Sequence, residues 1–74
     1  MKITIKSTTK IVKLNGVPAR IWEGKTESGI DVHCFVTRIA IDENETRADE
    51  FAVELQEHEP PTAAMEAYPL SMLI

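Results

Sequence analysis

Long apolar runs are missing from this 74-residue sequence, in which no uninterrupted apolar stretch exceeds three residues. A membrane-spanning helix needs about 20 consecutive apolar residues, so we expect none here. Residues 1–20 also lack a continuous apolar segment, and we therefore expect no secretory signal peptide. These absences favour a cytoplasmic protein that does not associate with membranes.

Cysteine and glycine are also scarce. Cys34 is the one cysteine, so no disulfide can stabilise the fold within the chain. The three glycines are scattered at positions 16, 24 and 29, which excludes a glycine-rich phosphate-binding loop. A chain of this length is expected to form a single domain, residues 1–74, with a small core.

Charge is present but unevenly distributed. Residues 1–41 contain seven basic and three acidic side chains and carry a net charge of +4, whereas residues 42–74 contain one basic and nine acidic ones, giving −8. The overall charge of −4 is thus the sum of two halves of opposite charge. The halves either attract each other within the fold or meet partners of opposite charge.

The first part of the basic half has the pattern of a β-hairpin. Residues 1–6 alternate apolar and polar side chains, as in a half-buried strand, and the polar run 7–9 indicates a bend or an edge position. Asn15-Gly16 then separates the apolar segments 11–14 and 17–22. Because a type I′ turn needs positive φ at both central residues, Asn-Gly predicts a tight hairpin here.

A second turn at residues 26–29 leads into a third predicted strand, residues 30–41. Both faces of this strand are largely apolar in its second half, so we expect it to be central or covered on both sides. Pro18 has no N–H group and is expected at an edge or at an unpaired position just after the hairpin.

The acidic half predicts one helix. Thr46 is the expected N-cap, with Asp49 three residues later, and Pro60-Pro61 is expected to end the helix. Apolar side chains at helical spacing form one face: Ala48, Phe51, Ala52 and Leu55. The short apolar segment 70–74 is a candidate fourth strand. Together these patterns predict an α+β fold, an antiparallel β-meander of three to four strands packed against one acidic α-helix.

Few residues have the spacing that a catalytic or metal-binding site requires. His33 and Cys34 are neighbours in a predicted strand, so their side chains point to opposite faces and cannot form a thiolate–imidazole pair. His58 stands between Glu57 and Glu59, but metal ligands must converge from several directions. We therefore predict no catalytic residues, no metal site and no cofactor, and we expect that the protein is not an enzyme.

The acidic segment is the first candidate binding surface. Eight carboxylates fall within 18 residues: Asp42, Glu43, Glu45, Asp49, Glu50, Glu54, Glu57 and Glu59. Four of them lie off the apolar helical face and are the predicted partner-binding residues: Asp49, Glu50, Glu54 and Glu57. An ordinary solvated helix face would explain them too. As a binding surface they would suit a basic protein groove, in a salt-sensitive encounter.

Two further features are candidates for binding. A row of basic side chains follows the first strand, Lys2, Lys6 and Lys10, and three more could join it: Lys13, Arg20 and Lys25. Such a row could follow phosphates, but only Trp22 and Phe35 are available for base stacking, and edge lysines that prevent aggregation explain the row better. Trp22 points away from its neighbour Ile21, so it is an exposed anchor if Ile21 is buried, and a core residue in the other register.

Two segments of the sequence resemble short uncharacterised proteins of phage and prophage genomes. They are Thr9-Lys10-Ile11-Val12-Lys13-Leu14-Asn15-Gly16-Val17-Pro18-Ala19-Arg20-Ile21-Trp22-Glu23-Gly24 and Val32-His33-Cys34-Phe35-Val36-Thr37-Arg38-Ile39-Ala40. The resemblance implies a small accessory protein of a bacterial cytoplasm and brings no catalytic residues. Small acidic phage proteins of mixed sheet and helix include anti-CRISPR and other anti-defence inhibitors, an analogy of size and charge.

The leading hypothesis is therefore a non-enzymatic, anti-CRISPR-like inhibitor. It would bind a host defence protein or nucleoprotein complex with its acidic helix against a basic nucleic-acid groove, and Trp22 would add an apolar anchor. One alternative is a small nucleic-acid-binding regulator that uses the basic sheet face, although we do not expect direct nucleic-acid binding. Another is a phage structural or assembly protein that forms a homodimer or larger homo-oligomer.

Overall fold

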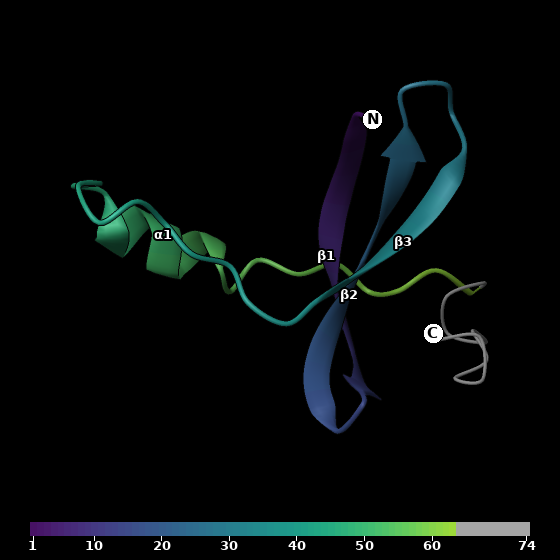
Figure 1. The fold of residues 1–74 in the computed structure, drawn as a ribbon, viewed down its shortest axis with the longest axis horizontal. Coiled ribbons are helices and arrows are strands. Elements are labelled where there is room, and N and C mark those ends of the chain that lie inside the picture. Colours follow the sequence, from purple (N-terminus) through teal and green to yellow (C-terminus); the bar gives the residue numbers. More distant parts are fainter. Residues whose placement is uncertain (64–74) are drawn as a thin grey trace.

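The computed structural model describes residues 1–63, which form a three-stranded antiparallel sheet and one short helix (Figure 1). The strands are β1 (Ile3–Leu14), β2 (Val17–Thr26) and β3 (Asp31–Val36), in the spatial order β1-β2-β3, and the helix is α1 (Ala48–Glu54). The predicted α+β meander is confirmed at this level. The candidate fourth strand lies outside the described residues. Within residues 1–63 no helix has the length and apolar character needed to cross a membrane.

The hairpin between β1 and β2 turns where the sequence predicts. Asn15 and Gly16 have φ values of 51° and 83°, the two consecutive positive angles of a type I′ turn. Leu14 and Val17 pair directly across this turn, and Pro18 pairs with Lys13. The pairing of β2 with β3 begins only at Arg20, so Pro18 lies where β2 has one neighbouring strand. That position tolerates its missing N–H group.

The polar run in the middle of β1 is an irregularity within one long strand. Ser7 pairs with Trp22 and Ile11 pairs with Arg20, so the three residues between Ser7 and Ile11 stand opposite Ile21 alone. The register shifts by two residues, which leaves every later side chain of β1 on its original face. The Thr8 hydroxyl donates a 2.7 Å hydrogen bond to the carbonyl oxygen of Ile21 and so satisfies a group at the irregularity.

The third strand is shorter and more peripheral than predicted. It ends at Val36 and lies at an edge of the sheet, so the predicted range 30–41 is wrong, and of the two expected surroundings the central position is wrong. Continued pairing would place Arg38 opposite Pro18, which has no N–H to donate. The side chains of Ile39 and Ile41 are 43% and 38% exposed beyond the end of the strand.

The helix also differs from its predicted boundaries. Its N-cap is Arg47, without a side-chain capping bond, so the prediction of Thr46 is wrong. Glu45 takes over part of that role, because its Oε1 accepts hydrogen bonds from the backbone N (3.1 Å) and Nε (2.7 Å) of Arg47. The helix ends at Glu54, and Glu57 therefore lies beyond it.

The two faces of the sheet have different surroundings. One face, the core face, carries the buried apolar side chains of Val12, Ala19 and Ile21, and the half-buried Phe35 packs against the cluster of Val12 and Ile21. The other face turns toward the end of α1. No residue of α1 is buried, and the helix lies to one side of the sheet (Figure 1).

The segment after α1 returns to the sheet and crosses the outer edge of β1. Glu59 donates its backbone N–H to the carbonyl oxygen of Ser7 and accepts from the N–H of Thr9, both at 3.0 Å. This single parallel bridge covers the irregular part of β1. Farther along, Thr62 donates from its backbone N (3.1 Å) and its hydroxyl (2.6 Å) to the Glu23 carboxylate. The segment therefore fixes the end of α1 relative to the sheet.

Candidate functional site

The face of the sheet opposite the core carries a row of paired side chains. Ser7 pairs with Trp22, and Trp22 pairs with Cys34, so all three project to the same side. Ile21 is fully buried on the core face, which places Trp22 on the other face, as expected for the register in which Ile21 is core. Trp22 is nevertheless half-buried, because residues after β3 and at the end of α1 approach it.

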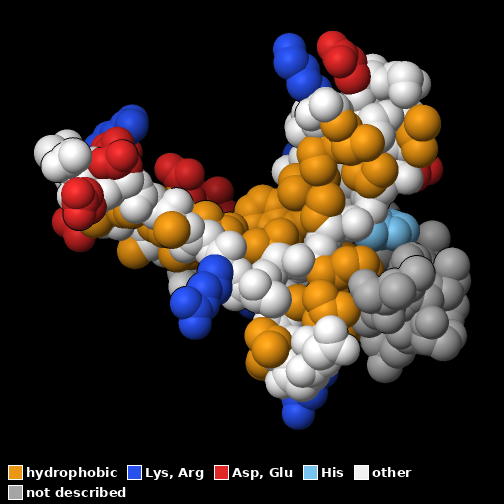
Figure 2. All heavy atoms as spheres, viewed as in Figure 1, with side chains coloured by type: hydrophobic (Ala, Val, Ile, Leu, Met, Phe, Trp, Pro, Cys, Tyr) orange, Lys and Arg blue, Asp and Glu red, His pale blue; other side chains and the backbone are white. Residues whose placement is uncertain are grey.

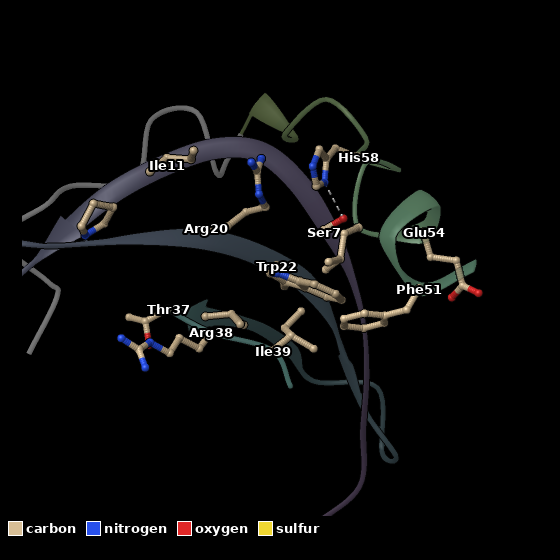
Figure 3. A pocket seen from close by; sticks show the side chains of 13 residues that line it. Ser7, Ile11, Arg20, Trp22, Thr37, Arg38, Ile39, Phe51, Glu54 and His58 are labelled. Carbon is tan, nitrogen blue, oxygen red and sulfur yellow. Dashed lines mark hydrogen bonds between the residues drawn. The ribbon is translucent and has the colours of Figure 1, made fainter. Parts of the chain in front are cut away.

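These elements enclose a concave site of about 480 Å³, which we call the hollow. Apolar and polar side chains from the sheet, the loop after β3 and the helix end line it: Ser7, Ile11, Pro18, Arg20, Trp22, Val36, Thr37, Arg38, Ile39, Phe51, Glu54, Leu55 and His58. Figure 3 shows Trp22, Ile39 and Phe51 pointing toward one another, with Arg20 and His58 on the far side of Trp22. Its size falls within the range of about 300–1,000 Å³ that is usual for ligand sites.

The hollow changes how Trp22 would contribute to binding. The sequence suggested an exposed anchor that inserts into a partner, whereas the structure makes the indole one wall of a concave surface (Figure 3). An amphipathic ring with a half-covered face is suited to receive an apolar group.

Three of the four predicted acidic residues lie on α1. Asp49 and Glu50 occupy its first turn and Glu54 is its last residue, while Glu57 follows in the next turn of chain. All four are exposed. No ion pair within residues 1–63 involves any of their carboxylates. We call these four residues the acidic patch, and Figure 2 shows acidic side chains gathered around α1 next to apolar ones that continue onto the sheet.

Two carboxylates near the acidic patch, those of Glu45 and Glu59, contact basic side chains of the same chain. Glu45 accepts a 2.7 Å hydrogen bond from Nε of Arg47, which lowers the pKa of Glu45 and raises that of Arg47. Glu59 lies 3.6 Å from Nζ of Lys6. The acidic patch is therefore distinct from the carboxylates that bind within the chain.

Within residues 1–63, one contact resembles a nucleophile–base pair, that between Ser7 and His58. Ser7 Oγ lies 2.9 Å from Nδ1 of His58, but also 2.7 Å from the carbonyl oxygen of Glu57. A carbonyl can only accept, so the single hydroxyl proton goes to Glu57 and His58 donates from Nδ1 to Ser7. In that arrangement the imidazole nitrogen nearest the serine is no base for it.

The other candidates for chemistry are separated. His33 pairs with Glu23 and Cys34 with Trp22, which puts them on opposite faces of the sheet, as predicted. His33 Nε2 lies 3.9 Å from Glu23 Oε1. Among residues 1–63 no three or more His, Cys, Asp or Glu side chains come together in a way that could hold a metal ion.

The six basic side chains of the predicted row do not all lie on one face of the sheet. Lys6 pairs with Glu23 and projects on the core face, whereas Lys13 pairs with Pro18 and projects on the face of the hollow. Lys25 contacts Asp31, with Nζ 2.8 Å from Oδ1. This division gives less continuous positive charge than the spacing in sequence suggested.

Sequence reasoning missed several residues of the hollow. The sequence pattern places Arg20, whose Nη1 donates a 2.8 Å hydrogen bond to the carbonyl oxygen of Thr8, only in the basic row. The sequence around His58 indicates only a candidate metal ligand. Phe51 and Leu55 did give a signal, since the apolar helical face predicted that both would approach the sheet.

We compared the chain with models of known protein families, with curated proteins and with solved structures, and no match was found in any of the three comparisons.

Proposed function

We propose that this protein is a non-enzymatic binding protein that docks through its acidic patch onto a basic protein surface. The observation that supports the proposal is the exposure of Asp49, Glu50, Glu54 and Glu57 on and beside a helix that lies to one side of the sheet (Figure 1). Like charges crowded on one short element repel one another. A partner of opposite charge relieves that repulsion and is steered to the site.

The partner that best fits this charge is a protein groove built to hold nucleic acid. Such grooves present arginine and lysine side chains to phosphates, and closely spaced carboxylates can occupy the same positions. Carboxylates in the groove would prevent nucleic acid from binding there, so the protein would inhibit its partner by competition and without a catalysed reaction. In its most specific form, the proposal is an anti-CRISPR-like phage inhibitor that acts on a defence complex in the cytoplasm of a bacterial host.

The proposal is tested by capture combined with competition. Tagged protein is incubated with host lysate beside a variant in which Asp49, Glu50, Glu54 and Glu57 are changed to lysine. We expect the natural chain to retain a nucleic-acid-binding protein that free nucleic acid displaces, and the variant to lose it while its circular dichroism is unchanged. Retention by both proteins, or indifference to nucleic acid, contradicts the proposal.

The same material separates the other classes of function. A gel shift of the purified protein with nucleic acid at low salt would show direct binding, with an affinity that falls steeply as salt rises. Light scattering of the purified protein would show a stable homodimer. Either result without a captured partner contradicts the proposal and favours that alternative.

A further inference from the structure

The hollow and the acidic patch share one residue. Glu54 lines the hollow together with Trp22 and Phe51, and it also lies on the outer surface of α1 beside Asp49 and Glu50. A molecule that binds the acidic patch is therefore in contact with the rim of the hollow. The two surfaces form one continuous site, negative on the helix and apolar between helix and sheet (Figure 2).

The interior of the hollow is suited to an apolar group. Trp22, Ile39 and Phe51 converge there, and Ile39 remains 43% exposed, so apolar area stays in contact with water (Figure 3). Removing such area from water gains roughly 25 cal/mol per Å². Concave apolar surfaces with a few charged groups at the rim are the places where a binding energy hot spot forms.

The charged side chains at the rim of the hollow determine which partner residues are favoured next to that apolar group. The helix side of the rim carries Glu54 and continues into the acidic patch. On the sheet side, Arg20 is hydrogen-bonded to Thr8, and Arg38 follows β3. A basic residue is therefore favoured next to the apolar group only in the direction of α1.

We infer that the hollow receives one large apolar side chain of a protein partner, from a segment in which lysine or arginine adjoins that side chain and lies against α1. This inference rests on the proposed function and specifies its partner, which must combine an apolar anchor with a one-sided basic run. The anchor supplies affinity and the basic run supplies orientation.

Trp22 provides the readout, since it is the one tryptophan of the chain. The probes are three short synthetic peptides: a phenylalanine followed by lysines, an alanine followed by the same lysines, and a phenylalanine followed by glutamates. We expect the first peptide to change the fluorescence of Trp22 and to bind at least about tenfold more tightly than the second, a difference of about 1.4 kcal/mol. The third is expected not to bind.

Two isoleucine variants locate the binding site. Ile39→Ser removes an apolar wall of the hollow, whereas Ile30→Ser changes an isoleucine that is 63% exposed near the β2–β3 turn, away from the hollow. We expect Ile39→Ser to raise the Kd for the phenylalanine–lysine peptide by about tenfold. Ile30→Ser is expected to leave that Kd within about threefold of the value for the natural chain.

The outcomes separate the inference from the proposed function. Equal binding of the phenylalanine and alanine peptides overturns the inference while the acidic patch still binds lysines. Equal binding of the phenylalanine–lysine and phenylalanine–glutamate peptides would show that the acidic side chains of α1 do not select a basic neighbour, and this would also overturn the inference. If no peptide changes the fluorescence of Trp22, the inference is also wrong, and light scattering then shows whether a second copy of the chain fills the hollow.

Discussion

The hydroxyl of Ser7 lies 2.9 Å from Nδ1 of His58 and joins the middle of β1 to the segment that follows α1. The same hydroxyl donates to the carbonyl oxygen of Glu57 at 2.7 Å, so one nearly buried group satisfies two partners. Two residues later, Glu59 adds its backbone bridge to β1. This contact determines where α1 lies relative to the hollow.

Ser7→Ala is expected to weaken the attachment of this segment. The substitution leaves the Glu57 carbonyl and the His58 N–H without their partner, at a cost of about 1–3 kcal/mol in the free energy of unfolding. Chemical denaturation measures it. Ser28→Ala removes an exposed hydroxyl 3.2 Å from Thr26 Oγ1 and is expected to change stability by less than about 0.5 kcal/mol. Equal effects of the two substitutions would contradict the assigned role of Ser7.

Gly24→Ala is expected to disrupt the pairing of β1 and β2. A Cβ atom at Gly24 would lie 1.8 Å from the backbone oxygen of Thr4, and backbone cannot move aside as a flexible side chain can. We expect a loss of about 3 kcal/mol or more, at the upper end of overpacking costs.

Gly16→Ala is the matched control for that prediction. Gly16 has no atom within 4 Å of the added Cβ, and only its φ of 83° opposes the substitution. The expected cost is about 1–2 kcal/mol, that of a left-handed conformation. Chemical denaturation measures both losses. Equal losses in the free energy of unfolding for Gly24→Ala and Gly16→Ala would contradict the close approach of β1 to Gly24.

How far the sequence predicts this fold depends on whether the deciding interaction is local. Asn15-Gly16 specifies its own turn, and the alternation around it specifies the strands, so both were predicted correctly. We attribute the early end of β3 to Pro18, which is distant in sequence and which continued pairing would place opposite Arg38. Periodicity alone therefore extends the strand too far, to Ile41.

The candidate site shows the same division. The carboxylates of α1 are visible in composition, and the alternation of Ile21 and Trp22 indicates that they face opposite ways. The hollow was not predictable, because it depends on how the chain after α1 crosses β1 at Ser7 and Glu59. No local pattern encodes that contact.

Acid is expected to reduce the stability that Asp31 contributes. Nζ of Lys25 donates a 2.8 Å hydrogen bond to Oδ1 of Asp31, and this bond together with the lysine charge lowers the pKa of Asp31 below its ordinary 3.8. The folded chain therefore binds this proton more weakly than the unfolded chain. The contribution is present above about pH 4 and is lost as the pH falls through the lowered pKa.

Asp31→Asn tests this pH dependence. The free energy of unfolding of the natural chain should exceed that of the variant near pH 6, and the difference should shrink toward zero near pH 2. Lys25→Met removes the cause of the lowered pKa and should have the same pH profile as Asp31→Asn. A difference that grows in acid would contradict the assignment.

The most direct test of the acidic patch compares two charge reversals of equal size. Glu54→Lys and Glu27→Lys change exposed glutamates and give the same net charge, but only Glu54 belongs to the acidic patch and lines the hollow. The measurement is the Kd of each protein for the captured nucleic-acid-binding partner, at low and at raised salt. We predict that Glu54→Lys raises Kd by about tenfold or more at low salt and that Glu27→Lys stays within about threefold, with the difference narrowing as salt rises. Equal Kd values for the two variants at low salt would contradict the claim that this protein binds its partner through the acidic patch.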